Sequence, residues 1–203
     1  MKFSPEFNLL VIVGQWNSAI LNPDWVSKYL LPDTKFNVEI PININGSMRF
    51  STDEFRFFIL DGKLFFSILK QEDAVYTKLG ELALNLVTYL PHTPVIGFGL
   101  NFNFECENSS KIDSLFTFGD ESDITNYGYD NSNSLIKRSF KDDNFVLNFS
   151  INKASNKYIF DFNFHFDIKT LVEFKDKFES ESLLKFRDTS LNFLNTIYDL
   201  QID

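Results

Sequence analysis

Several residue types that carry catalytic and redox chemistry are scarce in this 203-residue chain. It has one cysteine, Cys106, and two histidines, His92 and His165. A single cysteine excludes a disulfide within the chain, and so few thiol and imidazole groups leave little material for a Cys–His or Ser–His mechanism. Gly97 and Gly99 lie inside an expected strand, so they do not form a phosphate loop at the start of a helix. The sequence therefore favours a non-enzymatic protein and predicts no metal and no cofactor.

Long apolar runs and clusters of cations are also missing. The first apolar run, residues 9–13, is too short for a signal sequence or a membrane span, so we expect a cytoplasmic protein with no membrane partner. The only adjacent basic pair is Lys137–Arg138, and the formal net charge is −9. Nucleic acids are bound through clustered cations that release counterions, so no nucleic-acid partner is expected.

Phenylalanine is the abundant residue, with 25 copies, and hydrophobic residues make up 44% of the chain. Buried phenylalanine removes a large apolar area from water, so we expect one globular domain over residues 1–203. The frequent Asn, Phe, Ile and Lys indicate an AT-rich genome, of a bacterium or a phage.

The spacing of apolar residues predicts an α+β fold, in which two long helices pack on one face of a curved antiparallel sheet. Alternation is clearest in residues 157–168, where phenylalanine and polar residues take turns. Asn45–Gly46 and Asp61–Gly62 predict tight hairpin turns, and the polar stretch 119–133 predicts a long mobile loop. We expect strands at about 7–14, 35–44, 47–60 (with a break near 52–53), 63–70, 95–106, 134–140, 144–152 and 157–168, and helices at about 23–31, 73–90 and 182–199.

The order strand, short helix, several strands, long helix occurs twice, over residues 5–91 and 94–200. Val11–Gly14 opens one half and Val95–Gly97 the other, and we interpret this as an internal duplication. The element order resembles the TATA-binding-protein-like saddle, which implies that the two halves share one curved sheet. DNA binding is not implied, because residues 93–203 hold 18 acidic and 11 basic side chains and an acidic concave face would repel DNA.

A second resemblance involves residues 79–104, a helix followed by a strand. Thr93, Pro94, Gly99 and Leu100 match a T-P-x-x-x-x-G-L pattern. In this respect the segment resembles an uncharacterised, sporadically distributed bacterial family. That family has no settled activity, so the resemblance implies no function.

The most regular strand also carries the most interesting polar residues. Asp161, Asn163, His165 and Asp167 project to one face of it. A histidine between carboxylates suits a general base, a metal ligand or a partner contact, and the alternative is the solvated face of an amphipathic strand.

Aromatic and acidic residues elsewhere supply further candidates for partner binding. Trp16 and Trp25 suit interface anchors, with core packing as the alternative. The acids of the loop do not have the spacing of a calcium loop, and a solvated loop is the alternative role. The loop candidates are Asp120, Glu121, Asp123, Tyr127 and Tyr129.

These observations favour a non-enzymatic protein-binding or regulatory module, such as an accessory or inhibitory subunit of bacteria or phages in a phage-defence setting. A protein partner is expected, with a homodimer as one form of it, and an acidic surface suits a basic partner. One alternative is a carrier of a lipid or small molecule with an apolar cavity between helix and sheet. A second alternative is an enzyme that uses scattered acids and His165.

Overall fold

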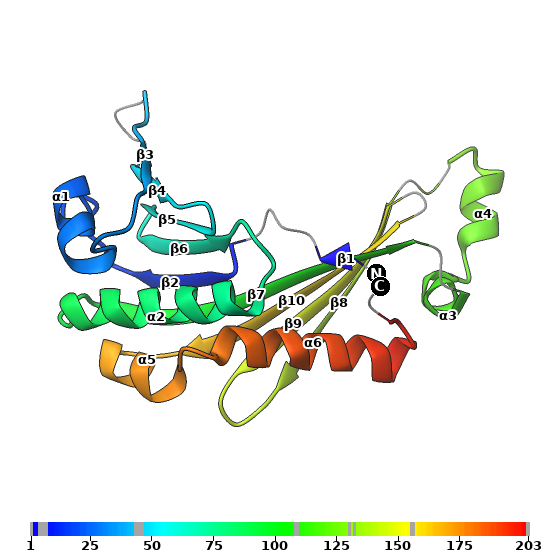
Figure 1. The fold of residues 1–203 in the computed structure, drawn as a ribbon. Coiled ribbons are helices and arrows are strands. Elements are labelled where there is room, and N and C mark those ends of the chain that lie inside the picture. The colour runs from blue at the N-terminus through cyan, green and yellow to red at the C-terminus, as the bar shows by residue number, and fades with distance from the viewer. Residues whose placement is uncertain are drawn as a thin grey trace.

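The computed structural model describes residues 2–3, 8–42, 47–107, 110–129, 131, 133–154 and 157–201. Its strands form a sheet, and its longer helices pack against that sheet (Figure 1). The strands are β1 (Lys2–Phe3), β2 (Leu10–Gly14), β3 (Asn37–Glu39), β4 (Arg49–Ser51), β5 (Phe55–Leu60), β6 (Lys63–Ile68), β7 (Val95–Glu107), β8 (Asn133–Lys141), β9 (Val146–Ala154) and β10 (Lys157–Asp167). The helices are α1 (Pro23–Trp25), α2 (Asp73–Tyr89), α3 (Ser110–Asp113), α4 (Glu121–Asn126), α5 (Leu171–Lys177) and α6 (Ser182–Tyr198), with a π-helical segment η1 (Val26–Leu30) and a 3-10 turn η2 (Ser114–Phe116).

All the strands belong to one antiparallel sheet. Nine of them follow the order β3-β4-β5-β6-β2-β7-β10-β9-β8, and β1 pairs with the far end of β7. The first strands of the two expected halves, β2 and β7, are neighbours at the middle of this order, where Leu10 pairs with Leu100. The expected α+β fold with a curved antiparallel sheet is confirmed, and the internal duplication stays a prediction.

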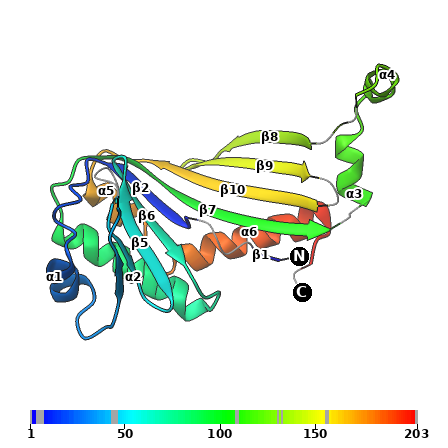
Figure 2. The ribbon, with the colours of Figure 1, turned by 90° about the horizontal axis from the view of Figure 1, so that it is seen from above.

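The helices α2, α5 and α6 cover one face of the sheet, and they lie behind the strands in Figure 2. The even-numbered residues of β7 and β10 point toward these helices, so the rings of Phe98 and Phe166 are stacked at 4.3 Å between centroids. Phe174 of α5 meets Phe98 edge-on at 4.9 Å. Aromatic rings therefore form the layer between helices and sheet. The other face of the sheet carries no helix in Figure 2, and we call it the open face.

The structure has the expected hairpin turn at Asp61–Gly62 and the expected helix cap at Asn22. Asp61 and Gly62 have φ values of 48° and 70°, which is the left-handed backbone of a two-residue hairpin turn. Asn22 caps the helix at Pro23, because its side chain accepts a hydrogen bond of 2.9 Å from the backbone N–H of Trp25. Asn45–Gly46 lies outside the described residues.

The strand expected over 47–60 has the break that was expected near residues 52–53. It is divided into β4 and β5, because the hydroxyl of Thr52 accepts hydrogen bonds from the backbone N–H groups of Glu54 and Phe55, each at 3.1 Å. One expected element differs from the structure. The long loop predicted over 119–133 contains α4, so it is partly helical. No helix in the described part of the chain combines the length and the apolar character that a membrane span requires.

Candidate functional site

A continuous row of amide side chains crosses the second half of the open face. The Ser139 hydroxyl donates to Asn148 Oδ1 at 2.9 Å, and Asn148 Nδ2 donates to Asn163 Oδ1 at 3.0 Å. Asn163 Nδ2 then donates to Asn101 Oδ1 at 2.7 Å, and Asn101 Nδ2 donates to the carbonyl of Asn8 at 2.8 Å. Each amide donates in the same direction from β8 to β7. The row therefore holds its side chains in fixed orientations before any partner arrives.

A carboxylate lies in the neighbouring row. Asp161 accepts a hydrogen bond of 3.1 Å from the hydroxyl of Ser150 on β9 and a short one from Asn103 Nδ2 on β7. Asn103 is 7% exposed although it points to the open face. Neutral donors on both sides therefore fix the position of the Asp161 carboxylate.

His165 lies close to the backbone of β7, because the residues facing it there are glycines. A Cβ atom placed on Gly97 would lie 3.2 Å from His165 Cε1, and one on Gly99 would lie 2.9 Å from Asn163 Nδ2. His165 Nε2 is 3.1 Å from Asp167 Oδ1, and the two side chains are 41% and 89% exposed. The pair is thus at the surface, near the end of β10.

The first half of the open face is aromatic and cationic. Phe58 and Phe65, paired across β5 and β6, stack with 4.9 Å between ring centroids. The guanidinium of Arg49 lies 5.1 Å from the centroid of Phe58. Glu39 lies 3.8 Å from Arg49 and 3.7 Å from Arg56, so one carboxylate is shared by two guanidinium groups.

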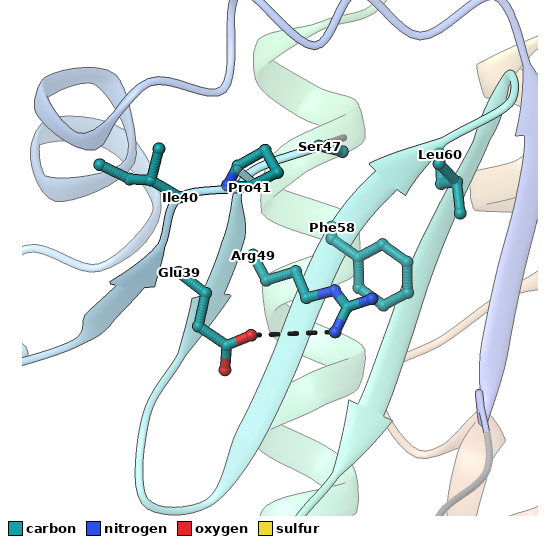
Figure 3. A pocket seen from close by; sticks show the side chains of 7 residues that line it. All are labelled: Glu39, Ile40, Pro41, Ser47, Arg49, Phe58 and Leu60. Atoms are coloured by element: carbon teal, nitrogen blue, oxygen red, sulfur yellow. Dashed lines mark ion pairs between the residues drawn. The ribbon is translucent and has the colours of Figure 1, made fainter. Parts of the chain in front are cut away.

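A pocket of about 270 Å³ opens beside these rings (Figure 3). The side chains of Phe58 and Arg49 form part of its wall, with an ion pair between Glu39 and Arg49. The lining residues are Glu39, Ile40, Pro41, Ser47, Arg49, Phe58 and Leu60. The pocket therefore combines apolar surface with charge.

Two projections border the open face and rise from opposite ends of the sheet, on the side away from the helices (Figure 1). The first, which we call the β3–β4 arm, comprises residues 37–42 and 47–51, and its Ile40 is 72% exposed. The second, the α3–α4 arm, comprises residues 110–129, and its Tyr127 and Tyr129 are 86% and 68% exposed. Both arms thus present large apolar groups to solvent at the rim of the open face.

The base of the α3–α4 arm is tied to the sheet by a charged cluster. The Tyr158 hydroxyl donates a short hydrogen bond to Asp113, and Lys153 Nζ donates to the same carboxylate at 3.0 Å. These two donors lower the pKa of Asp113. Phe116 stacks on the Tyr158 ring at 5.8 Å. The arm therefore starts from a fixed position even though its tip is exposed.

The expected site residues fall into separate places. Asp161, Asn163, His165 and Asp167 share the open face, and the acids of the expected loop belong to the α3–α4 arm at the other end of β10 (Figures 1 and 2). The structure therefore does not bring the loop acids to His165, as the enzyme alternative requires. Among the residues that the structure describes, no three His, Cys, Asp or Glu side chains form a group that could hold a metal ion.

The two tryptophans differ in exposure. Trp16 is 7% exposed, and its Nε1 donates to the carbonyl of Ile12 at 3.0 Å, so it packs in the core rather than at the surface. Trp25 is half-buried and lies 5.4 Å from Tyr29 and 6.2 Å from Tyr89, centroid to centroid. Of the two, Trp25 alone belongs to a partly exposed aromatic group.

Sequence reasoning missed the aromatic and cationic part of the open face. Residues 55–60 and 63–68 have apolar residues at both odd and even positions. This lack of alternation could have indicated that both faces of β5 and β6 carry aromatic rings. Phe58, Phe65 and Arg49 are the residues concerned.

The open face is close to electrically neutral, unlike the acidic face expected from the composition of the second half. Cross-strand pairing places one more basic than acidic side chain on it among the described strand residues. The basic ones are Arg49, Arg56, Lys63, Lys137, Lys141 and Lys157, and the acidic ones are Glu39, Glu105, Glu107, Asp161 and Asp167. The excess acid of the chain therefore lies on helices and connections.

Comparison of the chain with protein-family models, with curated proteins and with solved structures finds no match.

Proposed function

We propose that this protein is a non-enzymatic binding module, a regulatory or accessory subunit that holds a protein partner on the open face between its two arms. The observation that carries the proposal is the exposure of aromatic and aliphatic groups on both arms, with Tyr127 at 86% and Ile40 at 72%. Exposed apolar groups that gather at the rim of one face are typical of interaction surfaces, and tyrosine is enriched at binding hot spots.

The amide row supports the same proposal. Its side chains are already oriented by one another, from Ser139 to Asn101, so binding a partner would immobilise few additional rotamers. Preorganisation of this kind lowers the entropic cost of association. A nearly neutral platform also suits a protein surface better than a polyanion.

The carrier alternative receives less support. Buried rings occupy the layer between helices and sheet; for example, Phe98 contacts both Phe166 and Phe174. A ligand of a few hundred daltons needs a cavity of at least about 300 Å³. These rings fill the layer between α5 and the strands β7 and β10, whereas a pocket of about 290 Å³ between α2 and the β4–β5 turn is lined by several polar side chains, such as Glu54, Lys78 and Glu81.

The internal duplication belongs to the same proposal. We infer that β2 and β7 are counterparts, and that the helical segments after them, α1–η1 and α3–η2, are counterparts too, because each lies between the first strand of its half and the strands that follow. The strands of the two halves then extend outward to opposite edges of one sheet, with β3 at one edge and β8 at the other. A duplicated unit would thus have produced one platform with a different rim at each end.

Native mass spectrometry of protein purified gently from its host tests the proposal. We expect a defined complex with the unaltered chain, and its loss when Tyr127 and Tyr129 are both changed to Ala. The control changes Val172 and Ile197 to Ala, because these side chains are 68% and 47% exposed on the helix side. A complex that survives the tyrosine changes, or that is lost equally in the control, would contradict the proposal.

A further inference from the structure

The pocket on the β3–β4 arm has more hydrogen-bond donors than acceptors. Arg49 and Arg56 share the single carboxylate of Glu39, at 3.8 Å and 3.7 Å, whereas direct charge-assisted hydrogen bonds measure about 2.7 to 2.9 Å. Arg56 lies beside the pocket, and its buried Nε has no hydrogen-bond partner. The two guanidinium groups carry one positive charge more than Glu39 balances, so a further carboxylate is attracted to this place and can pair with Arg49 in the pocket wall.

The same pocket also has an apolar wall formed by Ile40, Pro41 and Leu60. A ligand that satisfies both features carries carboxylates next to an aliphatic or aromatic group. An acidic polypeptide segment with one apolar anchor has this chemistry, and rim charges around an apolar anchor are the usual anatomy of a specific interface.

This chain itself presents such a segment, on the α3–α4 arm at the opposite end of the sheet from the pocket. The tip of the α3–α4 arm carries Asp120, Glu121 and Asp123, and no lysine or arginine occurs between Lys111 and Lys137. Ile124 of the same tip is 42% exposed. The segment thus has the carboxylates that complement the guanidinium groups of the pocket and an apolar side chain that suits its apolar wall.

The two surfaces cannot meet within one molecule, because the arms rise from opposite ends of the sheet (Figure 1). Both arms rise on the same side, however, so a second copy can face the first with its ends exchanged. A two-fold axis perpendicular to the view of Figure 1 would set the pocket of each copy against the acidic tip of the other. Two-fold symmetry closes the assembly at two copies.

We propose that the partner held by the open face is a second copy of this chain, and that the α3–α4 arm of each copy docks in the β3–β4 pocket of the other. This inference rests on the proposed function, since it names the occupant of the same surface. The two contacts are identical by symmetry, and the amide rows of the two copies face each other between them.

Charge reversal in the full-length chain tests the proposal by sedimentation velocity at about 50 mM salt, where screening between exposed charges is weak. The first variant carries Asp120→Lys, Glu121→Lys and Asp123→Lys. The second carries Arg49→Glu, in the pocket wall, and Lys63→Glu, at the residue that pairs with Leu60 of the pocket across β5 and β6. We expect the unaltered chain to form dimers and each variant alone to dissociate at least tenfold more readily. An equimolar mixture of the two variants restores dimers, because each contact then pairs opposite charges again.

Two further measurements keep the result interpretable. Circular dichroism and urea unfolding establish that the variants fold, and Tyr127→Ser, a change at a side chain that is 86% exposed, weakens the dimer without reversing any charge. Val172→Ser on the helix side is the matched control and leaves the dimer unchanged.

An unaltered chain that stays monomeric up to high concentration overturns the inference, and so does a dimer that neither variant weakens. Species that grow beyond two copies overturn the two-fold arrangement. If the chain is monomeric but a host complex is lost in the Tyr127→Ala, Tyr129→Ala variant, the inference fails and the proposed function stands. If no host complex responds to these changes either, both fail.

Discussion

At the scale of single residues, Asn163 occupies the centre of the amide row, where it donates to Asn101 and accepts from Asn148. Asn163→Ala leaves Oδ1 of the half-buried Asn101 without its donor and Nδ2 of Asn148 without its acceptor. Because unsatisfied polar groups cost about 1 to 3 kcal/mol, we expect the free energy of unfolding to fall by that amount in urea titrations.

Ser139→Ala is the matched control for this prediction, because Ser139 ends the same row at an exposed position. Its removal should change the free energy of unfolding by less than about 0.5 kcal/mol. Equal losses in the two variants would show that the row does not act as a connected unit.

Tyr76 predicts an alkaline sensitivity of the fold. Burial raises its pKa from 10.0 to about 12, so the folded state keeps the phenol protonated where the unfolded chain ionises it. The stability linked to Tyr76 is fully present below pH 10 and is lost as the pH rises toward 12. The shift corresponds to about 2 to 3 kcal/mol.

Urea unfolding of the unaltered chain and of Tyr76→Phe at pH 9 and pH 12 measures this linkage. We expect the unaltered chain to lose more stability over this interval than the variant. Tyr127→Phe serves as control, because the Tyr127 ring is 86% exposed. Identical losses in the unaltered chain and in Tyr76→Phe would contradict the assignment.

At the scale of elements, α2 approaches the chain before α6 so closely that Gly80 has no space for a side chain. A Cβ atom on Gly80 would collide with the carbonyl oxygen of Ser180. Alanine raises the helix propensity of such a position by about 1 kcal/mol. Nevertheless, we expect Gly80→Ala to destabilise the protein by about 1 to 3 kcal/mol, because overpacking against backbone forces the elements apart.

Thermal unfolding measures the effect of Gly80→Ala, and Gly119→Ala provides the control, because a Cβ atom on Gly119 meets nothing within 4 Å. The control should unfold within a degree or two of the unaltered chain. An equally stable Gly80→Ala variant would mean that α2 and the segment at Ser180 can separate without loss.

Elements with strong periodicity could be predicted from the sequence. The expected helices at 73–90 and 182–199 correspond to α2 and α6, and the expected strands at 95–106 and 157–168 correspond to β7 and β10. In contrast, α4 escaped prediction, because it is short and polar and its N-cap residue, Asp120, makes no capping hydrogen bond. Such an element carries no local signal that distinguishes it from a loop.

The sequence predicted which candidate residues share a face of one strand, but not which strands lie beside it. Alternation placed Asp161, Asn163 and His165 on one face of β10, and the pairing of β10 with β7 and β9 agrees with it. The row from Ser139 to Asn101 depends on the register of the consecutive strands β8, β9 and β10, and on the pairing of β10 with β7, which is distant in sequence. Register of that kind is set by tertiary packing, so no local pattern reveals it.

At the scale of the whole molecule, the sheet continues without interruption from one expected half into the other. The junction is the pairing of β2 with β7, where Ile12 faces Phe98 and Leu10 faces Leu100. All four of these side chains are fully buried or nearly so. The helices α2 and α6 also contact each other beneath it. The two halves therefore share one core.

Division of the chain between residues 92 and 93, in the turn after α2, tests this shared core. Each fragment alone would expose the β2–β7 junction to water, and burial of apolar surface contributes roughly 25 cal/mol per Å². We therefore expect residues 1–92 and 93–203 to aggregate or remain unfolded when produced separately. Produced together, they should form a 1:1 complex with one cooperative thermal transition, measured by native mass spectrometry and calorimetry. A fragment that folds alone as a monomer, with a transition of its own, would show that the junction joins two independent domains. The open face between the arms would then lack the rigid base that the binding proposal requires.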